Sequence, residues 1–324
     1  MSTGWIRGLL VAPLLGLLCG PAAAQDWPTR SLTFIVPFAA GGGTDAFARP
    51  VAQLLGNRLG QRVLIENRPG AGGTAGAAAA AKAEPDGYTF FVGAAHHAVA
   101  PAIYPKLTYD ILRDFIPVAM LSRPPSVLVV HPERVKARTM AELIRAAKDE
   151  PDKLVYGHAG VGTTHHLAGE LFKLLTGTKI RPVPYRGSGP LVADLIAGQI
   201  DMAFDGLGSS APQIEGGNFR ALVVAAPERV AAFPNLPTGK ELGLQGYEVS
   251  TWYAVFAPKG TPQPIVDRMI REIRTTLAAP EIKDIWEKNG SDVPDLSGPA
   301  FGDFVAREVE RWAKVVEAAG VKLE

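Results

Sequence analysis

Short apolar runs that alternate with helical patterns recur along this chain of 324 residues. Residues 32–38 (LTFIVPF) form a continuous apolar run, which is typical of a strand buried on both faces of a sheet. Similar runs occur at residues 62–66 and 88–92, with a helical pattern at residues 47–59 and an alanine-rich stretch at residues 74–83 between them. This alternation predicts a parallel sheet with right-handed crossovers.

The same alternation starts again after residue 125. Thr139 and Glu142 stand three residues apart, as in a capping box, where both side chains bond to the backbone at the start of a helix. A last helix is predicted over residues 301–319, where apolar residues recur at helical spacing. Further strands are predicted at residues 126–130, 153–156, 180–185, 201–205, 221–225 and 252–257.

This order of elements predicts an α/β fold of two lobes, each a mostly parallel sheet flanked by helices, with a ligand cleft between the lobes. With 47% hydrophobic and 20% charged residues, the chain is large enough for two cores. We expect a signal peptide at residues 1–24, lobe 1 at residues 25–125 and 245–324, and lobe 2 at residues 126–244.

The N-terminus has the three parts of an export signal. Arg7 supplies a positive charge, residues 9–18 are a short apolar run, and small residues end at Ala24. Because the run is too short to span a bilayer, we expect cleavage after Ala24 and a periplasmic protein. Cys19, the only cysteine, lies in this segment, so the mature chain would have no disulfide. Lipidation at Cys19 is an alternative that the preceding Leu18 argues against, because a small residue is needed there.

Two glycine-rich loops have the construction of an anion site. The formal net charge is only +1, which gives no basic footprint for nucleic acid, so an anion must be held by local geometry. Residues 37–45 (PFAAGGGTD) and 157–163 (GHAGVGT) each join a predicted strand to a helix, with Thr44 and Thr163 as candidate helix caps. Free N–H groups and the helix dipole favour an anion at such a loop.

Both loops would lie at the carboxyl ends of their strands, one in each lobe, where ligands bind in open α/β sheets. A single loop of this kind could also be only a turn, but a pair favours a carboxylate site. Neither loop has the Gly-Lys-Ser/Thr of a phosphate-binding loop or the G-x-G-x-x-G of a dinucleotide loop, so no cofactor is expected. Arg186 is either a partner for a ligand carboxylate or a solvated turn residue.

Histidines and acidic residues raise two alternatives. His165 and His166 suggest a metal, but adjacent residues point about 100° apart on a helix and no H-E-x-x-H spacing exists, so no metal site is expected. Capping, solvent contact or ligand contact is favoured for His165, and a place at the edge of the core for His166. Asp45 and Asp205 suggest an acid–base pair, but a first-turn carboxylate more simply stabilises the start of a helix. The sequence has no mature cysteine and no G-x-S-x-G, and we expect no enzyme. Tyr253 is expected to pack in the core or hinge, with contact to the ligand as the alternative.

Longer segments resemble one family. They are WPTRSLTFIVPFAAGGGTDAFAR, VLIENRPGAGG, GHAGVGTTHHLAGELF, VPYRGSGPLVADLIAGQIDMAFD and WYAVFAPKGTP, with others between them, and they cover nearly all of the mature chain. On these segments the chain resembles the substrate-binding proteins of tripartite tricarboxylate transporters, the Bug (Bordetella uptake gene) family. The resemblance implies a two-lobed periplasmic protein that captures a mono-, di- or tricarboxylate, aromatic ones included, for the membrane subunits of a transporter.

An exported sensor that passes its closed state to a membrane signalling partner is the alternative function, and in either case we expect a monomer without cofactors. The resemblance also implies where the ligand binds. Two stretches depart from the commoner family pattern, with His158 in place of a serine and His96 and His97 in a stretch usually richer in serine or threonine, so the ligand's identity stays open. The candidate ligand-binding residues are Phe38, Ala39, Gly42, Gly43, Thr44, Asp45, Ala95, His96, His97, His158, Ala159, Gly160, Gly162, Thr163, Tyr185, Arg186 and Asp205.

Overall fold

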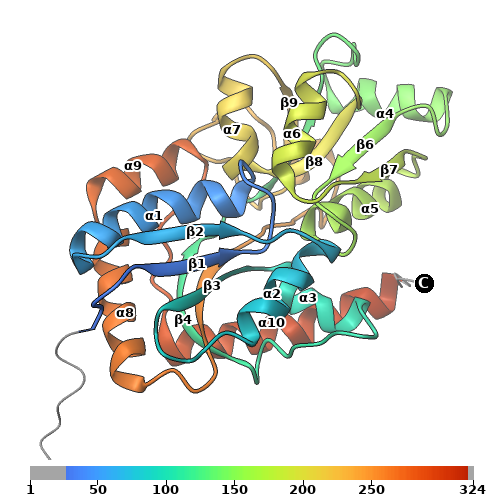
Figure 1. The fold of residues 1–324 in the computed structure, drawn as a ribbon. Helices are drawn as coiled ribbons and strands as arrows, with labels where there is room; N and C mark the ends of the chain where they lie inside the picture. Colours follow the sequence, from blue (N-terminus) through green and yellow to red (C-terminus); the bar gives the residue numbers. More distant parts are fainter. Residues whose placement is uncertain (1–26, 320–324) are drawn as a thin grey trace, which may run out of the picture.

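The computed structural model describes residues 27–319, so the expected signal peptide, its cleavage site and Cys19 lie outside the described residues. The chain forms two five-stranded sheets, each covered by helices, which make two lobes (Figure 1). The first sheet has the order β2-β1-β3-β10-β4, built from β1 (Leu32–Val36), β2 (Val63–Asn67), β3 (Thr89–Ala94), β4 (Phe115–Ser122) and β10 (Tyr253–Pro258). The second has the order β7-β6-β8-β5-β9, built from β5 (Ser126–Val130), β6 (Val155–His158), β7 (Arg181–Pro184), β8 (Met202–Gly206) and β9 (Arg220–Val224).

Helices cover both faces of the first sheet. On one face α1 (Gly43–Leu59), α8 (Gln263–Leu277) and α9 (Pro280–Lys288) pack over the strands through a shared apolar core. On the other face lie α2 (Thr74–Ala81), α3 (His96–Ile103) and the long α10 (Gly298–Ala319). Strand β1, which lies between β2 and β3, is almost fully buried, as its continuous apolar run predicts, while the edge strand β2 is largely half-buried.

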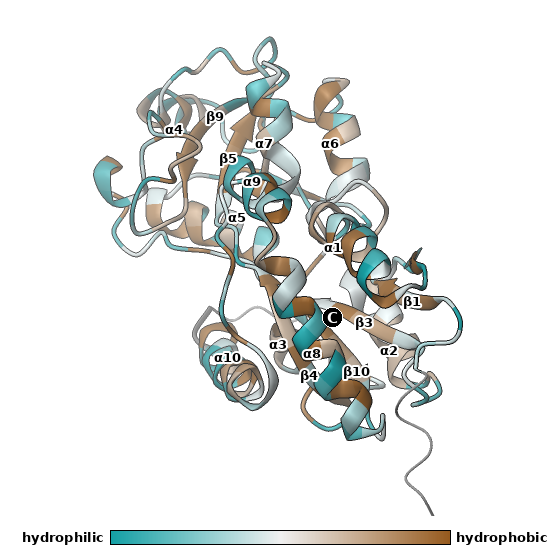
Figure 2. Ribbon diagram, turned by 90° about the vertical axis from the view of Figure 1, so that its left-hand side faces the viewer, coloured by the Kyte–Doolittle hydropathy of each residue, from teal (hydrophilic) through white to brown (hydrophobic). Residues whose placement is uncertain are grey.

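The second sheet is built in the same way. Two helices, α4 (Met140–Asp149) and α5 (Thr164–Thr176), bury their apolar sides on one face. The opposite face is covered by α6 (Ser188–Ile196) and α7 (Leu207–Glu215). Figure 2 shows apolar residues concentrated in the strands and polar residues on the outer sides of the helices. Within residues 27–319 no helix has both the length and the apolar composition needed to cross a bilayer.

Two segments cross from lobe to lobe side by side. The first leads from β4 into β5, and the second leads from the end of lobe 2 into β10. The Ser126 N–H donates to the Val249 carbonyl at 2.8 Å, and the Thr251 N–H donates to the Pro124 carbonyl at 3.1 Å. These crossings form a hinge at which the lobes can turn relative to each other.

The two-lobed α/β fold with mostly parallel sheets is confirmed, and in each sheet four strands run in one direction and one strand runs against them. In each sheet two strand pairs are parallel and two are antiparallel. The antiparallel strands are β10 in the first sheet and β5 in the second. Each enters its sheet through the hinge from the other lobe, so neither is placed by the βαβ crossover that makes neighbouring strands parallel.

Most elements begin within a few residues of the predicted positions. The capping box is confirmed, because the Thr139 hydroxyl accepts the Glu142 N–H while the Glu142 carboxylate accepts the Thr139 N–H. The sequence pattern did not identify β4, α3, α7 or α9 as separate elements. β4 contains Pro117 and two irregularities in its pairing, and α3 and α7 contain Pro101 and Pro212, so their periodic signals are weak.

Candidate ligand-binding site

A small enclosed cavity lies between the lobes, at the carboxyl ends of strands from both sheets. Its volume is about 20 Å³, which is room for one water molecule. The first residues of four helices face it, namely Gly43 of α1, His96 of α3, Thr164 of α5 and Ser188 of α6. The described residues that line it are Phe38, Gly42, Gly43, Thr44, His96, Ala159, Thr163, Thr164, His165, Ser188, Thr251 and Tyr253, none of them lysine or arginine.

The glycine loop of lobe 1 is fixed by Asp45 rather than by Thr44. The expectation that Thr44 caps α1 is wrong, because the helix begins one residue earlier and no side chain caps it. Instead the Asp45 carboxylate accepts the Gly41 N–H at 3.0 Å, Arg49 Nε at 2.7 Å and Asn67 Nδ2 at 3.1 Å. Burial acts to raise the pKa of Asp45, but these hydrogen bonds outweigh it, and the pKa lies below its ordinary value. Asp45 therefore positions the loop, and both oxygens of its carboxylate accept hydrogen bonds from within lobe 1.

Two adjacent histidines begin α3, and only the first of them lines the cavity. The His96 ring packs edge-on against Phe38, with ring centres 4.6 Å apart. Below it, His97 accepts the Ala94 N–H on Nδ1 at 2.9 Å and places Nε2 at 3.2 Å from His96 Nε2. Burial lowers the pKa of His96 well below its ordinary value and that of His97 to about 4, so both rings are neutral at pH 7. His97 supports His96 from behind.

The glycine loop of lobe 2 closes on itself at the start of α5. Gly160 and Gly162 have φ angles of 130° and 78°, which side chains rarely tolerate. The prediction that Thr163 caps the helix is confirmed, since its hydroxyl accepts the His166 N–H at 3.3 Å and also donates to the Gly160 carbonyl at 2.7 Å. Ala159 and Thr163 line the cavity, and the Gly160 carbonyl is turned into the loop.

His158 is buried at the end of β6 and does not line the cavity. Its Nδ1 accepts the Gly160 N–H at 3.3 Å, and its ring lies 4.5 Å from that of His166. Burial lowers the pKa of His158 to about 3, with the nearby His166 adding to the effect. In this arrangement His158 supports the loop, and a contact with ligand would need a rearrangement of the loop.

Asp205 lies directly behind the cavity wall. Its side chain is fully buried and accepts hydrogen bonds from the hydroxyls of Ser188 at 2.5 Å, Ser209 at 2.7 Å and Ser210 at 2.8 Å. His165 is the nearest titratable partner, with Nδ1 at 3.5 Å from Asp205 Oδ1. Asp205 thus orients Ser188, which lines the cavity, without facing the cavity itself.

The remaining candidates take part through the backbone or lie behind the wall. Ala95 is buried, and its N–H donates to the Trp252 carbonyl at 3.0 Å. The Tyr185 hydroxyl donates to Asp194 at 2.8 Å within lobe 2, and burial together with this carboxylate raises the pKa of Tyr185. Arg186 is exposed, and its carbonyl accepts the Ala39 N–H at 3.2 Å across the cleft. The loop that contains Ala39 in lobe 1 and the loop that contains Arg186 in lobe 2 therefore meet through main-chain atoms.

Five lining residues were not among the candidates, although ligand contact was one alternative for His165 and for Tyr253; the five are Thr164, His165, Ser188, Thr251 and Tyr253. Thr164, His165 and Ser188 stand in the first turn of a helix that follows a strand. Ligands in α/β sheets bind at the carboxyl ends of the strands, so the end of the strand predicted at residues 180–185 would have pointed to Ser188. Tyr253 was expected to pack in the core or hinge. It is buried, but its hydroxyl reaches the cavity beside Gly43, where a Cβ atom would lie only 2.3 Å from it.

The two lobes touch closely around this cavity. The Tyr104 hydroxyl of lobe 1 donates to the Val161 carbonyl of lobe 2 at 2.9 Å. At Gly189 the lobes approach so closely that a Cβ atom would stand 2.0 Å from the Ala40 carbonyl oxygen. The structure is therefore a closed arrangement, in which the walls of the cavity meet across the cleft.

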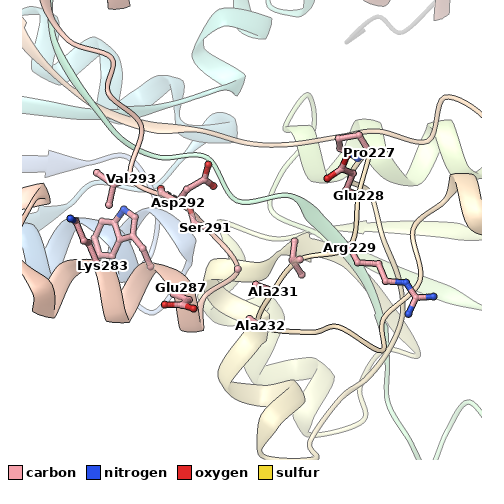
Figure 3. Close-up of a pocket in the computed structure, with 13 residues that line it drawn as sticks. Pro227, Glu228, Arg229, Ala231, Ala232, Lys283, Glu287, Ser291, Asp292 and Val293 are labelled. Atoms are coloured by element: carbon pink, nitrogen blue, oxygen red, sulfur yellow. Dashed lines mark hydrogen bonds between the residues drawn. The ribbon is translucent and has the colours of Figure 1, made fainter.

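A larger hollow of about 690 Å³ opens between the lobes on the side of α9. Figure 3 shows that it is an open groove between residues 227–232 of lobe 2 and residues 283–293 of lobe 1. The Arg229 side chain turns away from the groove and pairs with Glu241 at 3.0 Å. Lys283, Glu287 and Asp292 are exposed, so charges of both signs are already solvated there. The small cavity, with convergent helix starts and buried polar groups, is the better candidate site.

Among residues 27–319 there is no group of three or more histidine, cysteine or acidic side chains placed to hold a metal ion. His165 and His166 illustrate the reason. His165 faces the cavity, whereas His166 Nε2 lies 3.9 Å from Glu170, on another side of the helix.

Comparison with known proteins gives concordant matches. A sequence model of the family described as "Tripartite tricarboxylate transporter family receptor" matches residues 47–321. Protein BugT of Bordetella pertussis is 37% identical over 309 residues, which are 95% of this chain and 94% of BugT.

Two solved structures of similar proteins contain a ligand. An R. palustris protein with adipate is 38% identical, with a TM-score of 0.88 over 92% of this chain and 100% of that one. MatC from Rhodopseudomonas palustris with bound malate is 35% identical, with a TM-score of 0.84 over 90% of this chain and 100% of that one.

Proposed function

The chain belongs to the tripartite tricarboxylate transporter receptor family, and we propose that it is a periplasmic solute-binding protein that captures a small carboxylate between its lobes. Four helix starts, two from each lobe, converge on one enclosed cavity, and this convergence carries the proposal. A helix N-terminus presents free N–H groups and a partial positive charge. A single anionic group at this place would therefore contact both lobes at once.

The chemistry of the wall suits a carboxylate. The described lining has no lysine or arginine, so the anion would be held by helix dipoles, N–H groups and a hydroxyl such as that of Thr44. The hydroxyls of Thr163 and Ser188 already donate to the Gly160 carbonyl and to Asp205. Carboxylate oxygens accept several such hydrogen bonds. Adipate and malate in the two similar structures are small dicarboxylates, which supports the same class of ligand for this chain.

Capture works by closure of the lobes. The cavity of the closed arrangement has room for one water only, so a carboxylate ligand enters when the lobes turn apart at the hinge. When the lobes close again around the ligand, the cavity is wider than in this structure. A ligand shifts this equilibrium only as far as it binds the closed form better than the open one. A ligand that bridges α1 and α5 does so, because only closure brings both helix starts to it.

The partner of the closed form would be the membrane subunits of a tripartite tricarboxylate transporter. We assign no catalytic role to the site, because the carboxylates that could act as acid and base, Asp45 and Asp205, are both held by other side chains of their own lobe. Binding and release of an unchanged ligand is the activity that this arrangement supports.

Calorimetry with acetate, benzoate, adipate, malate and citrate tests the proposal. At least one carboxylate is expected to bind, and at about 100 times its Kd it should raise the free energy of unfolding by about 2.7 kcal/mol. Binding of a sugar or an amine, with no response to any carboxylate, would contradict the proposal.

A substitution in the cleft locates the site. Gly189→Ala places a methyl group against the Ala40 carbonyl of the other lobe and should weaken binding by about tenfold or more, because closure is blocked. Gly302→Ala is the matched control, since it also adds a methyl group to a helix but meets only the ring of Pro117 within lobe 1. Equal affinities in both variants would place the site elsewhere.

A further inference from the structure

His165 is a buried side chain that faces the cavity without a partner of its own. It is 5% exposed and lines the cavity beside Thr164. Neither Nδ1 nor Nε2 makes a hydrogen bond to any described residue. Buried polar groups in native proteins are nearly always bonded, so an unpartnered ring at the wall of a cavity is placed to bond what the cavity holds, a water in the free protein or a ligand in the complex.

Asp205 lies behind His165 and determines which nitrogen is available. The Asp205 carboxylate is 3.5 Å from His165 Nδ1 and is otherwise bonded only by the hydroxyls of three serines. No described lysine or arginine pairs with it, so its negative charge is uncompensated inside the protein. The proton of the neutral imidazole is favoured on Nδ1, next to this carboxylate, which leaves Nε2 as an unused acceptor.

We propose that His165 binds the ligand carboxylate as an imidazolium, so that capture of the ligand takes up one proton from solvent. This inference rests on the proposed function and deepens it. The proton goes to the free ring nitrogen, and no other bond forms or breaks. Charges then alternate along the line of Asp205, His165 and ligand, and both nitrogens of the ring gain an anionic partner.

The groups that face His165 make the uptake depend on the ligand. Asp205 from β8 favours the charged ring, while His96 from α3 and His158 from β6 face it with neutral rings, and the Tyr253 hydroxyl from β10 lies across Gly206. In the free protein, burial outweighs Asp205 and lowers the pKa of His165. A carboxylate that enters adds a second anion and removes water, which raises this pKa.

Because binding of the carboxylate requires protonation of His165, the ligand binds more tightly as the pH falls. The affinity changes by at most about tenfold per pH unit for one linked proton, between the pKa of His165 in the bound protein and its lower value in the free protein. Above this window the affinity is lowest, because the ring stays neutral in the complex. The receptor would thus release its ligand more readily at higher pH.

Calorimetry in buffers of different ionisation enthalpy counts the protons directly. The probe is whichever of acetate, benzoate, adipate, malate and citrate binds most tightly, titrated from about pH 8 to about pH 6, where acetate and benzoate are ionised. For adipate, malate and citrate, whose last proton dissociates near the lower end of this range, the ligand's own ionisation is subtracted. Wild-type protein should take up a fraction of a proton at high pH that rises toward one as the pH falls. His165→Asn, which cannot titrate, should bind without proton uptake and with an affinity that varies less than about twofold over this range.

His166→Asn is the matched control, because His166 is the next residue of α5 but lies beside Glu170 and does not line the cavity. It should keep the proton uptake of the wild type. If His165→Asn does not fold, nitrogen-15 NMR of labelled histidines in wild-type protein replaces it, and the bound state should contain one more imidazolium than the free state.

Binding of the probe without proton uptake overturns the inference and leaves the proposed function standing. Uptake that persists in His165→Asn also overturns it, because another group then takes the proton. Absence of binding by every carboxylate overturns the proposed function and this inference together.

Discussion

The two walls of the cleft each contain a buried aspartate close behind a helix start, and the two are held in opposite ways. In lobe 1, Asp45 is bonded to Arg49, whose guanidinium is half-exposed, and to Asn67 and the Gly41 N–H. In lobe 2, Asp205 is fully buried and bonded only by hydroxyls, with His165 beside it. The first carboxylate is neutralised and the second is not.

This difference separates a structural group from one that can respond to a ligand. Asp45 fixes the course of a loop, and its charge is balanced whatever the cavity contains. Asp205 leaves an unbalanced charge near the cavity, which the protein tolerates because three hydroxyls are aimed at it. The same residue type at corresponding places thus gives one rigid wall and one wall that can change its protonation.

The largest expected effect comes from replacing the two aspartates by asparagine. Asp205→Asn should lower the free energy of unfolding by about 2–4 kcal/mol, because it weakens three charge-assisted hydrogen bonds of a fully buried carboxylate. Asp45→Asn should cost about 1 kcal/mol, since Arg49 is half-exposed and solvent can replace the lost charge. Urea denaturation at pH 7 measures both. Equal losses in the two variants would remove the distinction between the walls.

The second prediction concerns acid, and it uses a buried histidine from each wall. Burial lowers the pKa of His97 to about 4 and that of His158 to about 3, so each is neutral in the folded protein at a pH where the unfolded chain is protonated. The free energy of unfolding is therefore unaffected by each histidine above about pH 6.5 and decreases as the pH falls toward the pKa of that histidine in the folded protein. At about pH 5 each of these histidines should lower the free energy of unfolding by about 2 kcal/mol relative to pH 7.

Denaturation of His97→Asn and His158→Asn at pH 7 and pH 5 tests this. Each variant should lose about 2 kcal/mol less than wild type between the two pH values, whatever its stability at pH 7. The comparison is made within each variant, so a loss of packing in the substituted protein does not affect it. A variant that keeps the full wild-type loss has a histidine that is already charged or exposed in the folded state.

Features set by neighbouring residues could be predicted from the sequence. The cap at Thr163 and the capping box at Thr139 follow from spacings of three residues, and β5 follows from one apolar run that occupies Ser126–Val130. The two glycine loops were recognised because each stands between a strand and a helix. The sequence therefore identified most of the elements and the two glycine loops that line the candidate cavity.

Features that depend on distant residues could not be predicted. The sequence left ligand contact by His165 as one alternative, but His165 becomes a candidate for proton uptake only when Asp205, forty positions along the chain, is known to lie 3.5 Å away and to have no cationic partner among the described residues. Arg186 was considered for its charge, whereas the contact that the structure places across the cleft belongs to its carbonyl. Direct contacts between the lobes depend on how far the hinge turns, and no local pattern encodes that angle.

The smallest expected effect distinguishes contacts across the cleft from contacts within one wall. Tyr104→Phe removes the hydroxyl that donates to Val161 of the other lobe and should weaken carboxylate binding by about 2- to 10-fold, because the bond exists only in the closed form. Tyr185→Phe removes a hydroxyl bonded to Asp194 inside lobe 2, a bond present in open and closed forms alike, and should leave the affinity within about twofold. Calorimetry with one carboxylate measures both variants. A larger loss in Tyr185→Phe than in Tyr104→Phe would mean that lobe 2 rearranges on binding, with Tyr185 turned toward the ligand, and that the walls of this closed structure are not the walls the ligand meets.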